Sequence, residues 1–410
     1  MELRRQGAMT VTTGSILVIG GGIIGMAVAL SLQDRGFHVI VADPGDLPRP
    51  ASWGNAGRIA VELSEPLSSL KTLQSVPGAL FSRGGPIAFP AASMSAWLPF
   101  GLRLLAASSP KRFRHGAEAL SSLLAKALPA WRHRLSDIGA PELLVETGHY
   151  SIWESPSLSV SGRKAWYRNS GTATAMELDP TELNRLSSLI RVPIAGSLKF
   201  VGTASIADPS DLCAAMQEAF LKRSGRLETC RLAVETATRM ADLVVVTAGV
   251  DSGDLLRAMG HTVPMIAERG YHIEQLGTSW PRDIPPIYFE DRSVVLTRFR
   301  SALRATSFVE FTLKSAPPDS RKWARLREHA RDLGLPFDDS ATQWMGSRPT
   351  LPDYLPAIGR SQKQRNVFYA FGHQHLGLTL AAITGELLAA LISNEPLSVD
   401  PEPFDIDRFN

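Results

Sequence analysis

The chain has 410 residues, which is long enough for two domains with sizeable cores. Hydrophobic residues make up 44% of it and charged residues 20%, an ordinary globular balance, and the net charge of +3 is too small to indicate a nucleic-acid partner. The two cysteines, Cys213 and Cys230, form no CxxC pair and have no metal-ligand spacing. We therefore expect free thiols, a reducing compartment and no metal site.

The sequence predicts neither a signal peptide nor a membrane-spanning helix. Residues 1–13 carry Arg4 and Arg5 but lack the apolar core of a signal peptide, so we expect a loose tail. No apolar run reaches the roughly 18 residues of a membrane-spanning helix. The expected location is cytoplasmic, at most peripheral at the inner face of the membrane.

The first pattern in the chain is a strand, a glycine-rich turn and a helix. Ile16 to Ile19 is apolar, as in a strand buried on both faces of a parallel sheet. Gly20, Gly22 and Gly25 follow with the spacing G-x-G-x-x-G, and Ile23 to Gln33 continues as a helix. The first glycine makes a tight turn, the second lets backbone approach a pyrophosphate, and the third lets the helix pack against the strand.

A second apolar strand, Phe37 to Ala42, ends at Asp43, which lies 18 residues after Gly25. An acid roughly 20 residues on accepts a hydrogen bond from a ribose hydroxyl and would repel a 2′-phosphate. These features in register predict a dinucleotide site rather than a glycine-rich turn without a ligand, and leave both NAD and FAD open. The loop 51–57 then follows, rich in small residues. Its position is equally consistent with a loop that contacts the cofactor and with a plain surface loop.

Residues 86–107 are apolar with scattered prolines, and a basic run, 111–115, follows at once. The pattern is typical of a buried helical hairpin, and a basic flank beside an apolar stretch is also typical of an interfacial membrane contact. Both interpretations stay open.

The middle of the chain alternates between helical and strand patterns. The expected helices are 118–135, 177–186, 211–222 and 319–333, and the expected strands lie within 143–153, 200–206, 241–246, 269–275, 294–299 and 303–311. The strand 241–246 is buried and ends in small residues, as a strand returning to the dinucleotide sheet would. The nucleotide domain should therefore be discontinuous in sequence.

A second glycine-rich turn, 372–379, lies between a strand, Asn366 to Phe371, and an apolar helix that runs to Ile392. A buried helix that points its amino end at a cofactor supplies partial positive charge and free N–H groups. This stabilises an electron-rich reduced flavin, and NAD has no such need. The second turn thus favours FAD over NAD.

Besides the first glycine motif, six separated stretches resemble motifs of one known protein family: 52–57, 206–209, 244–249, 269–271, 344–359 and 372–379. Together they resemble the D-amino-acid oxidase (DAO) superfamily of flavoproteins, and most of all its D-amino-acid dehydrogenase branch. Residues 356–359 and 374–375 with His272 are similar to such proteins of hydroxyproline catabolism.

The resemblance implies an α/β fold with a Rossmann-like FAD-binding domain, discontinuous in sequence, and a second α+β substrate domain built on an antiparallel sheet. We assign residues 14–80, 200–255 and 345–400 to the FAD-binding domain, and 81–199 and 256–344 to the substrate domain. FAD would be bound non-covalently, because no cysteine lies near the carboxyl end, where sarcosine oxidases tether their flavin.

The expected cofactor-binding residues come from both glycine-rich turns, the first two strand ends and the 241–246 strand end. They are Gly20, Gly22, Ile24, Gly25, Asp43, Pro44, Ser52, Asn55, Ala56, Gly57, Ala248, Gly249, Gly372, His373, Gly377, Leu378 and Thr379.

Oxidation of an amino acid at Cα needs a residue that binds the substrate carboxylate, and the substrate amine must be neutral. By the resemblance Arg348 lies over the flavin face, and its guanidinium fork matches a carboxylate. Tyr271 would add a hydroxyl to the same carboxylate, or would be a core tyrosine. His272 and His375 are candidates to take the amine proton, or are structural.

One stretch departs from the family pattern. Such proteins usually carry a β-hairpin over the adenine side of FAD, after the helix at 211–222. Only residues 225–241 are available here, with little alternation, so the hairpin should be short or missing and FAD affinity lower.

Three other functions stay open. A glycine or sarcosine oxidase would use the same fold and a similar carboxylate grip. A non-catalytic FAD-binding subunit of an oxidoreductase complex would bind flavin without reacting with amines. An NAD dehydrogenase leaves the second glycine turn unexplained. The enantiomer comes only from the resemblance, and the electron acceptor, whether a quinone, oxygen or a partner protein, cannot be read.

Overall fold

The computed structural model describes residues 14–45 and 51–410, so the expected tail 1–13 lies outside the described residues. A six-stranded sheet has the order β10-β2-β1-β11-β18-β17. All its neighbours are parallel except β17 and β18. Its strands are β1 (Ser15–Ile19), β2 (His38–Asp43), β10 (Arg226–Thr229), β11 (Leu243–Val246), β17 (Ala357–Arg360) and β18 (Val367–Phe371). The sheet draws on three separate parts of the chain, as predicted.

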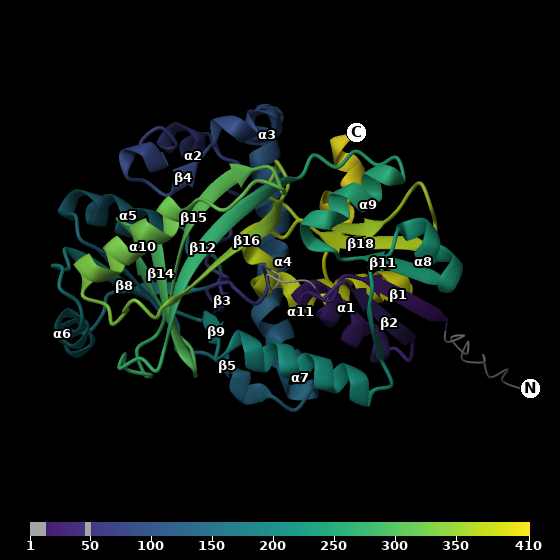
Figure 1. The fold of residues 1–410 in the computed structure, drawn as a ribbon, viewed down its shortest axis with the longest axis horizontal. Helices are drawn as coiled ribbons and strands as arrows, with labels where there is room; N and C mark the ends of the chain where they lie inside the picture. The colour runs from purple at the N-terminus through teal and green to yellow at the C-terminus, as the bar shows by residue number, and fades with distance from the viewer. Residues whose placement is uncertain (1–13, 46–50) are drawn as a thin grey trace, which may run out of the picture.

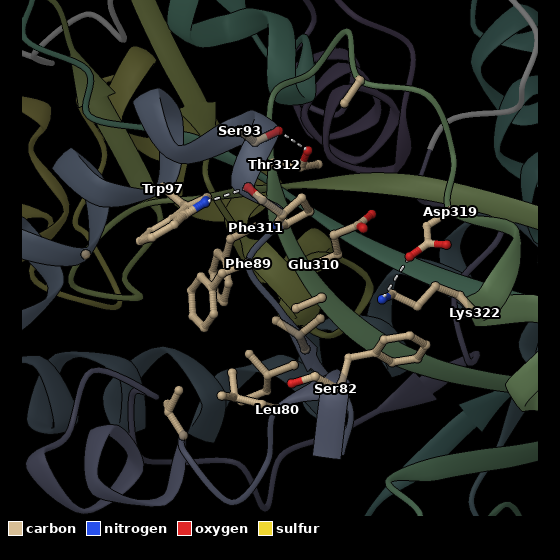
Figure 2. Close-up of a pocket in the computed structure, with 18 of the residues that line it drawn as sticks. Leu80, Ser82, Phe89, Ser93, Trp97, Glu310, Phe311, Thr312, Asp319 and Lys322 are labelled. Atoms are coloured by element: carbon tan, nitrogen blue, oxygen red, sulfur yellow. Dashed lines mark hydrogen bonds and ion pairs between the residues drawn. The ribbon is translucent and has the colours of Figure 1, made fainter. Parts of the chain in front are cut away.

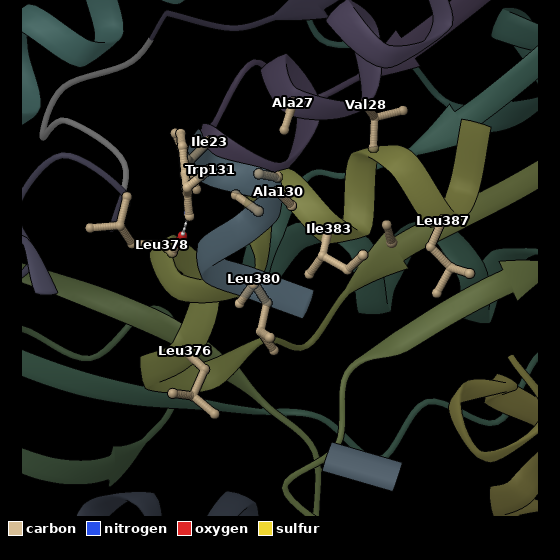
Figure 3. Packing of buried hydrophobic residues seen from close by; sticks show 14 of the residues in the cluster. Ile23, Ala27, Val28, Ala130, Trp131, Leu376, Leu378, Leu380, Ile383 and Leu387 are labelled. Atoms are coloured by element: carbon tan, nitrogen blue, oxygen red, sulfur yellow. Dashed lines mark hydrogen bonds between the residues drawn. The ribbon is translucent and has the colours of Figure 1, made fainter. Parts of the chain in front are cut away.

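Both faces of the sheet are covered at its centre, which is why β1, β11 and β18 are apolar, whereas the edge strand β10 is exposed. Ile16 and Val18 pack on one face with α1 (Ile23–Gln33), α4 (Pro110–Asp137), α7 (Pro209–Lys222) and α11 (Gly377–Ile392). Leu17 and Ile19 pack on the other with α8 (Val234–Met240) and α9 (Ser252–Ala258). Figure 3 shows Trp131 of α4 beside the first turn of α11, where its Nε1–H donates to the Leu378 carbonyl oxygen (2.9 Å).

A nine-stranded, mostly antiparallel sheet lies beside the first (Figure 1). Its order is β16-β12-β15-β14-β13-β6-β8-β7, and β4 pairs with β15. The strands are β4 (Ile87–Ala88), β6 (His149–Trp153), β7 (Thr174–Met176), β8 (Gly196–Val201), β12 (Ile266–Leu276), β13 (Ile287–Phe289), β14 (Val294–Arg298), β15 (Ala302–Thr312) and β16 (Thr342–Thr350). The helices α5 (Pro156–Arg168), α6 (Pro180–Leu189) and α10 (Ser320–Leu333) accompany it, and β3 (Arg58–Ile59), β9 (Ala204–Ile206) and β5 (Leu144–Val145) form a small third sheet.

The predicted mixed α/β class is confirmed, and one strand differs from the expected division into domains. Residues 225–241 hold a single strand, β10, on the edge of the first sheet and then α8, so the missing hairpin is confirmed for these residues. β16 pairs with β12 in the second sheet, although we had assigned residues from 345 onward to the FAD-binding part. The sequence could not show this, because Gly346 and Pro349 obscure the strand pattern of β16.

The structure shows where two apolar segments lie. The 86–107 stretch is not a buried hairpin: α3 (Met94–Ala107) buries only Phe100 and Ala107 and leaves one side in solvent. One helical segment, Gln374–Ile392, is by length and composition apolar enough to span a membrane, with a mean hydropathy of 1.7. Because 78% of it is buried inside the fold, against α1 and α4, it is most simply a core helix.

Candidate active site

Two glycines shape the turn after β1. Gly20 has a φ of +107°, in the left-handed region, and a Cβ there would lie 2.6 Å from the Thr247 carbonyl oxygen. A Cβ at Gly25 would collide with the Gly20 carbonyl oxygen. The Cβ position of Gly22 meets only the Ser52 hydroxyl, 3.4 Å away, so backbone is open to a ligand here. This geometry fits the roles predicted for the three glycines.

The carboxylate of Asp43 lies across the same turn. Its Oδ2 accepts a hydrogen bond from the Gly21 N–H (2.7 Å), and its Oδ1 accepts one from the Gly45 N–H (2.9 Å). The Ser52 hydroxyl accepts from the Ile23 N–H at the amino end of α1 (3.1 Å). Partial positive charge at this helix end favours an anionic phosphate.

A cavity of about 950 Å³, here called the cofactor cavity, opens at the carboxyl ends of β1, β2, β11 and β18. Its size is at the upper end of the roughly 300–1,000 Å³ that small-molecule sites occupy. The predicted residues that line it are Gly20, Gly22, Ile24, Asp43, Pro44, Ser52, Asn55, Ala248, Gly249, Arg348, His373, His375, Gly377 and Leu378. Tertiary structure thus brings together both glycine-rich turns, the 51–57 loop and Arg348.

The other predicted residues are not part of this lining. They are Gly25, Ala56, Gly57, Tyr271, His272, Gly372 and Thr379. The Ala56 carbonyl oxygen accepts a hydrogen bond from the Thr297 hydroxyl (2.8 Å), and the Thr379 hydroxyl accepts one from the Ala60 N–H (3.0 Å). These groups support the backbone behind the wall instead of facing the cavity.

Two buried polar atoms in the second turn show that the cofactor cavity suits a polar ligand. His373 Nδ1 and Gln374 Oε1 have no hydrogen-bond partner within the described parts of the chain, and both residues line the cavity. Buried polar atoms rarely lack a partner in native proteins. With the open backbone at Gly22, they fit a bound dinucleotide. Gln374 was not among the predicted cofactor residues. Its backbone has a left-handed φ of +43°, and a glutamine does not mark such a conformation in the sequence as a glycine would.

Arg348 is held from behind by a buried carboxylate. It pairs with Glu268 across β16 and β12, and its Nη1 lies 3.0 Å from Glu268 Oε1. A Cβ at Gly270, the next residue on that face, would collide with Arg348 Nη2, so this glycine makes the room that the guanidinium occupies. Nη2 donates to no described residue, which leaves it available to a ligand in the cavity.

Tyr271 is on the opposite face of the sheet from Arg348. Its hydroxyl donates to Glu310 Oε2 (2.6 Å) and accepts from the Asp319 N–H (3.2 Å), and its ring packs against Trp323. Burial and the neighbouring carboxylate raise the pKa of Tyr271. Of the two interpretations, the structure places Tyr271 in the core, because strand alternation turns it away from the cofactor cavity.

His272 also has a structural position. Its Nδ1 lies 2.8 Å from the Gly54 carbonyl oxygen, and its ring stacks on Trp344 with centroids 4.9 Å apart. Burial lowers the pKa of His272 to about 3, so the ring is neutral near pH 7. It connects β12 to the 51–57 loop and does not line the cavity.

His375 is the histidine that shares the cavity wall with Arg348. Burial lowers the pKa of His375 to about 4, and the positive charge of Arg348 adds to the shift. Its ring has no hydrogen bond to the described residues. A neutral imidazole in the wall of the cavity can accept a hydrogen bond from an amine, and Arg348 and His375 are the two predicted catalytic candidates that the structure brings together.

Comparison with known proteins agrees with this site. Residues 15–391 match the family model described as DAO, FAD dependent oxidoreductase. The chain belongs to this family. It is an FAD-dependent oxidoreductase, and the predictions of family, cofactor and enzyme class are confirmed.

Two relatives of this DAO-family chain have similar lengths. A D-amino-acid oxidase from Bradyrhizobium diazoefficiens is 29% identical, over 96% of this chain and 98% of the relative. A D-amino acid dehydrogenase from Helicobacter pylori is 24% identical, over 92% and 94%. Among solved structures, glycine oxidase from Geobacillus kaustophilus has a TM-score of 0.71 and 19% identity, over 96% and 98% of the two chains. This last likeness shows the fold alone.

Proposed function

We propose that this protein is a D-amino-acid dehydrogenase that removes two electrons from Cα of its substrate, with D-proline or D-hydroxyproline as the first candidates. The observation that supports it is the position of Arg348, anchored by Glu268 and lining the same cavity as His375. The preference for D-amino acids rests on the names of the two relatives.

The anchored guanidinium would bind the substrate carboxylate. Arg348 Nη1 is used by Glu268, and Nη2, which has no partner among the described residues, would offer N–H donors to a carboxylate in the cavity. Charge-assisted hydrogen bonds of this kind are about twice as strong as neutral ones. Because Glu268 fixes the guanidinium before the substrate arrives, little side-chain entropy is lost on binding.

His375 would favour the neutral amine, because its uncharged ring accepts a hydrogen bond there. Bound FAD would supply the acceptor for the hydride that leaves Cα. The amine must first lose a proton to solvent so that its lone pair can form the C=N bond, and the neutral imidazole of His375 would accept a hydrogen bond from the remaining N–H. The imine then leaves, and water converts it to a 2-oxo acid and ammonia, or it stays cyclic if the substrate is a proline.

The test is anaerobic reduction of the purified flavoprotein. D- and L-proline, the hydroxyproline isomers, D-alanine, glycine and sarcosine are added separately, and loss of the oxidised-flavin absorbance is followed. Bleaching by D-amino acids and not by their L-isomers is the expected result. Bleaching by L-isomers alone would overturn the proposal.

The same panel separates the other functions. Bleaching by glycine or sarcosine in preference to D-amino acids would identify an amine oxidase of the glycine oxidase type. Flavin that no amine bleaches would identify a non-catalytic subunit. Reoxidation of the bleached protein by oxygen, compared with a quinone analogue, identifies the class of electron acceptor.

A further inference from the structure

The segment from α2 (Leu70–Ser75) to α3 presents a large apolar surface to solvent. Four side chains of α3 are mostly outside: Met94 (52% exposed), Leu98 (47%), Leu102 (63%) and Leu105 (55%). Their spacing of four, four and three residues puts them on one side of the helix. Leu67, Leu70 and Phe89 add to this surface from the preceding segments. We call these seven side chains the apolar face.

The apolar face is not a core surface that lost its partner. α3 is already fixed to the second sheet by its other side, where Phe100 packs against Phe311 with ring centroids 5.7 Å apart. Exposed contiguous apolar patches of this kind mark interaction sites in soluble proteins.

The charge around the apolar face has one sign. Residues 66–117 contain no Asp or Glu, and they contain six basic residues, Lys71, Arg83, Arg103, Lys111, Arg112 and Arg114. All six are exposed. A run of 52 residues without an acid is unusual in a chain that has 40 acids in 410 residues. The face is therefore complementary to an anionic partner.

A second cavity, of about 1,400 Å³, opens through the same surface. Four residues belong both to the apolar face and to the cavity lining: Leu67, Phe89, Leu98 and Leu102. Figure 2 shows Phe89 and Trp97 on one side of it and Asp319 and Lys322 of the α10 region on the other. Three acids line the cavity, Glu310, Asp319 and Glu328, and three bases of α10 line it too, Arg321, Lys322 and Arg325.

We propose that the apolar face docks on an anionic lipid bilayer. The four α3 side chains would enter the boundary between head groups and acyl chains, while the six basic residues contact lipid phosphates. A second copy of the chain fits less well, because a two-fold contact would bring the same positive charges together. This inference does not depend on the substrate of the enzyme.

The test is co-sedimentation of the full-length flavoprotein with vesicles. We expect binding to phosphatidylcholine vesicles in which about a third of the lipid is phosphatidylglycerol, weaker binding to phosphatidylcholine alone, and loss of binding as salt is raised. Leu105→Glu should lower the partition coefficient at least about tenfold, because a leucine no longer enters the bilayer. Lys111→Gln and Arg112→Gln should each lower it about fivefold on anionic vesicles only.

Matched controls come from α8, on the other sheet. Met240 is 58% exposed. Met240→Glu and Arg239→Gln therefore make the same apolar-to-acid and base-to-amide changes away from the apolar face, and should leave vesicle binding unchanged. Unaltered circular dichroism and flavin content show that each variant is folded. Equal binding of Leu105→Glu and Met240→Glu, or no binding of the wild type to anionic vesicles, would overturn the proposal. So would a dimer in vesicle-free sedimentation velocity that Leu105→Glu converts to a monomer.

Discussion

Glu268 and Arg348 face one another across β12 and β16, and their charged atoms Oε1 and Nη1 are 3.0 Å apart. Glu268 is 1% exposed, and its other oxygen accepts hydrogen bonds from the hydroxyls of Thr350 (3.1 Å) and Tyr354 (3.2 Å). The carboxylate is therefore fully used inside the protein. It orients the guanidinium, whose Nη2 has no partner among the described residues.

Replacing Arg348 should weaken substrate binding without loss of flavin. We expect Arg348→Lys to raise KM about tenfold and Arg348→Ala about a hundredfold, since hydrogen bonds to charged groups are worth about 1.5–3 kcal/mol. Steady-state kinetics with a dye acceptor, together with the flavin content, check this. An unchanged KM would remove Arg348 from the role.

Gly270 should control the position of Arg348. The methyl group of Gly270→Ala collides with Nη2, so we expect a higher KM although residue 270 touches no substrate. Gly101→Ala is the control, because a Cβ there meets nothing within 4 Å. If both variants have the wild-type KM, the guanidinium does not need this space.

Tyr271→Phe should affect stability and leave KM alone. The substitution removes the hydrogen bond from the hydroxyl to Glu310, and leaves that buried carboxylate with one partner fewer. We expect a loss of about 1–3 kcal/mol in the free energy of unfolding, measured by denaturant titration. A large rise in KM would instead return Tyr271 to the substrate site.

The buried histidines should destabilise the apoprotein in acid. Burial lowers the pKa to about 3 for His272 and His373 and to about 4 for His375, whereas an unfolded histidine titrates near 6.5. Below that pH the unfolded chain binds more protons, so stability falls as pH falls towards the folded-state pKa values. Each histidine contributes at most about 1.4 kcal/mol per pH unit. The melting temperature measured from pH 7 to pH 5 checks this, and His373→Gln should flatten the slope.

Asp43 should determine FAD affinity and not turnover. We expect Asp43→Ala to raise the Kd for FAD about tenfold, because the Gly21 N–H loses its acceptor and a ribose hydroxyl would lose one too. Asp242 is the control: its carboxylate accepts from the Ser15 N–H (2.8 Å) at the other end of β1, away from the cavity. Fluorescence titration of the apoproteins with FAD compares the two.

Local patterns were sufficient to predict the nucleotide-binding half. The G-x-G-x-x-G turn, Asp43 and the apolar strands depend on backbone conformation and burial over a few residues, and these leave direct marks in the sequence. The same holds for the second glycine-rich turn. The tail and residues 46–50 lie outside the described residues, so predictions there stay predictions.

Only the tertiary structure decided which side chains of the second sheet reach the cofactor cavity. The resemblance offered Arg348 and Tyr271 for the same carboxylate and His272 for the amine, but the regular pairing of β12 with β16 puts Arg348 and Tyr271 on opposite faces of the sheet. Likewise, the apolar composition of α3 could not show which side is covered. Burial depends on partners distant in the chain, whereas a glycine turn depends on its neighbours.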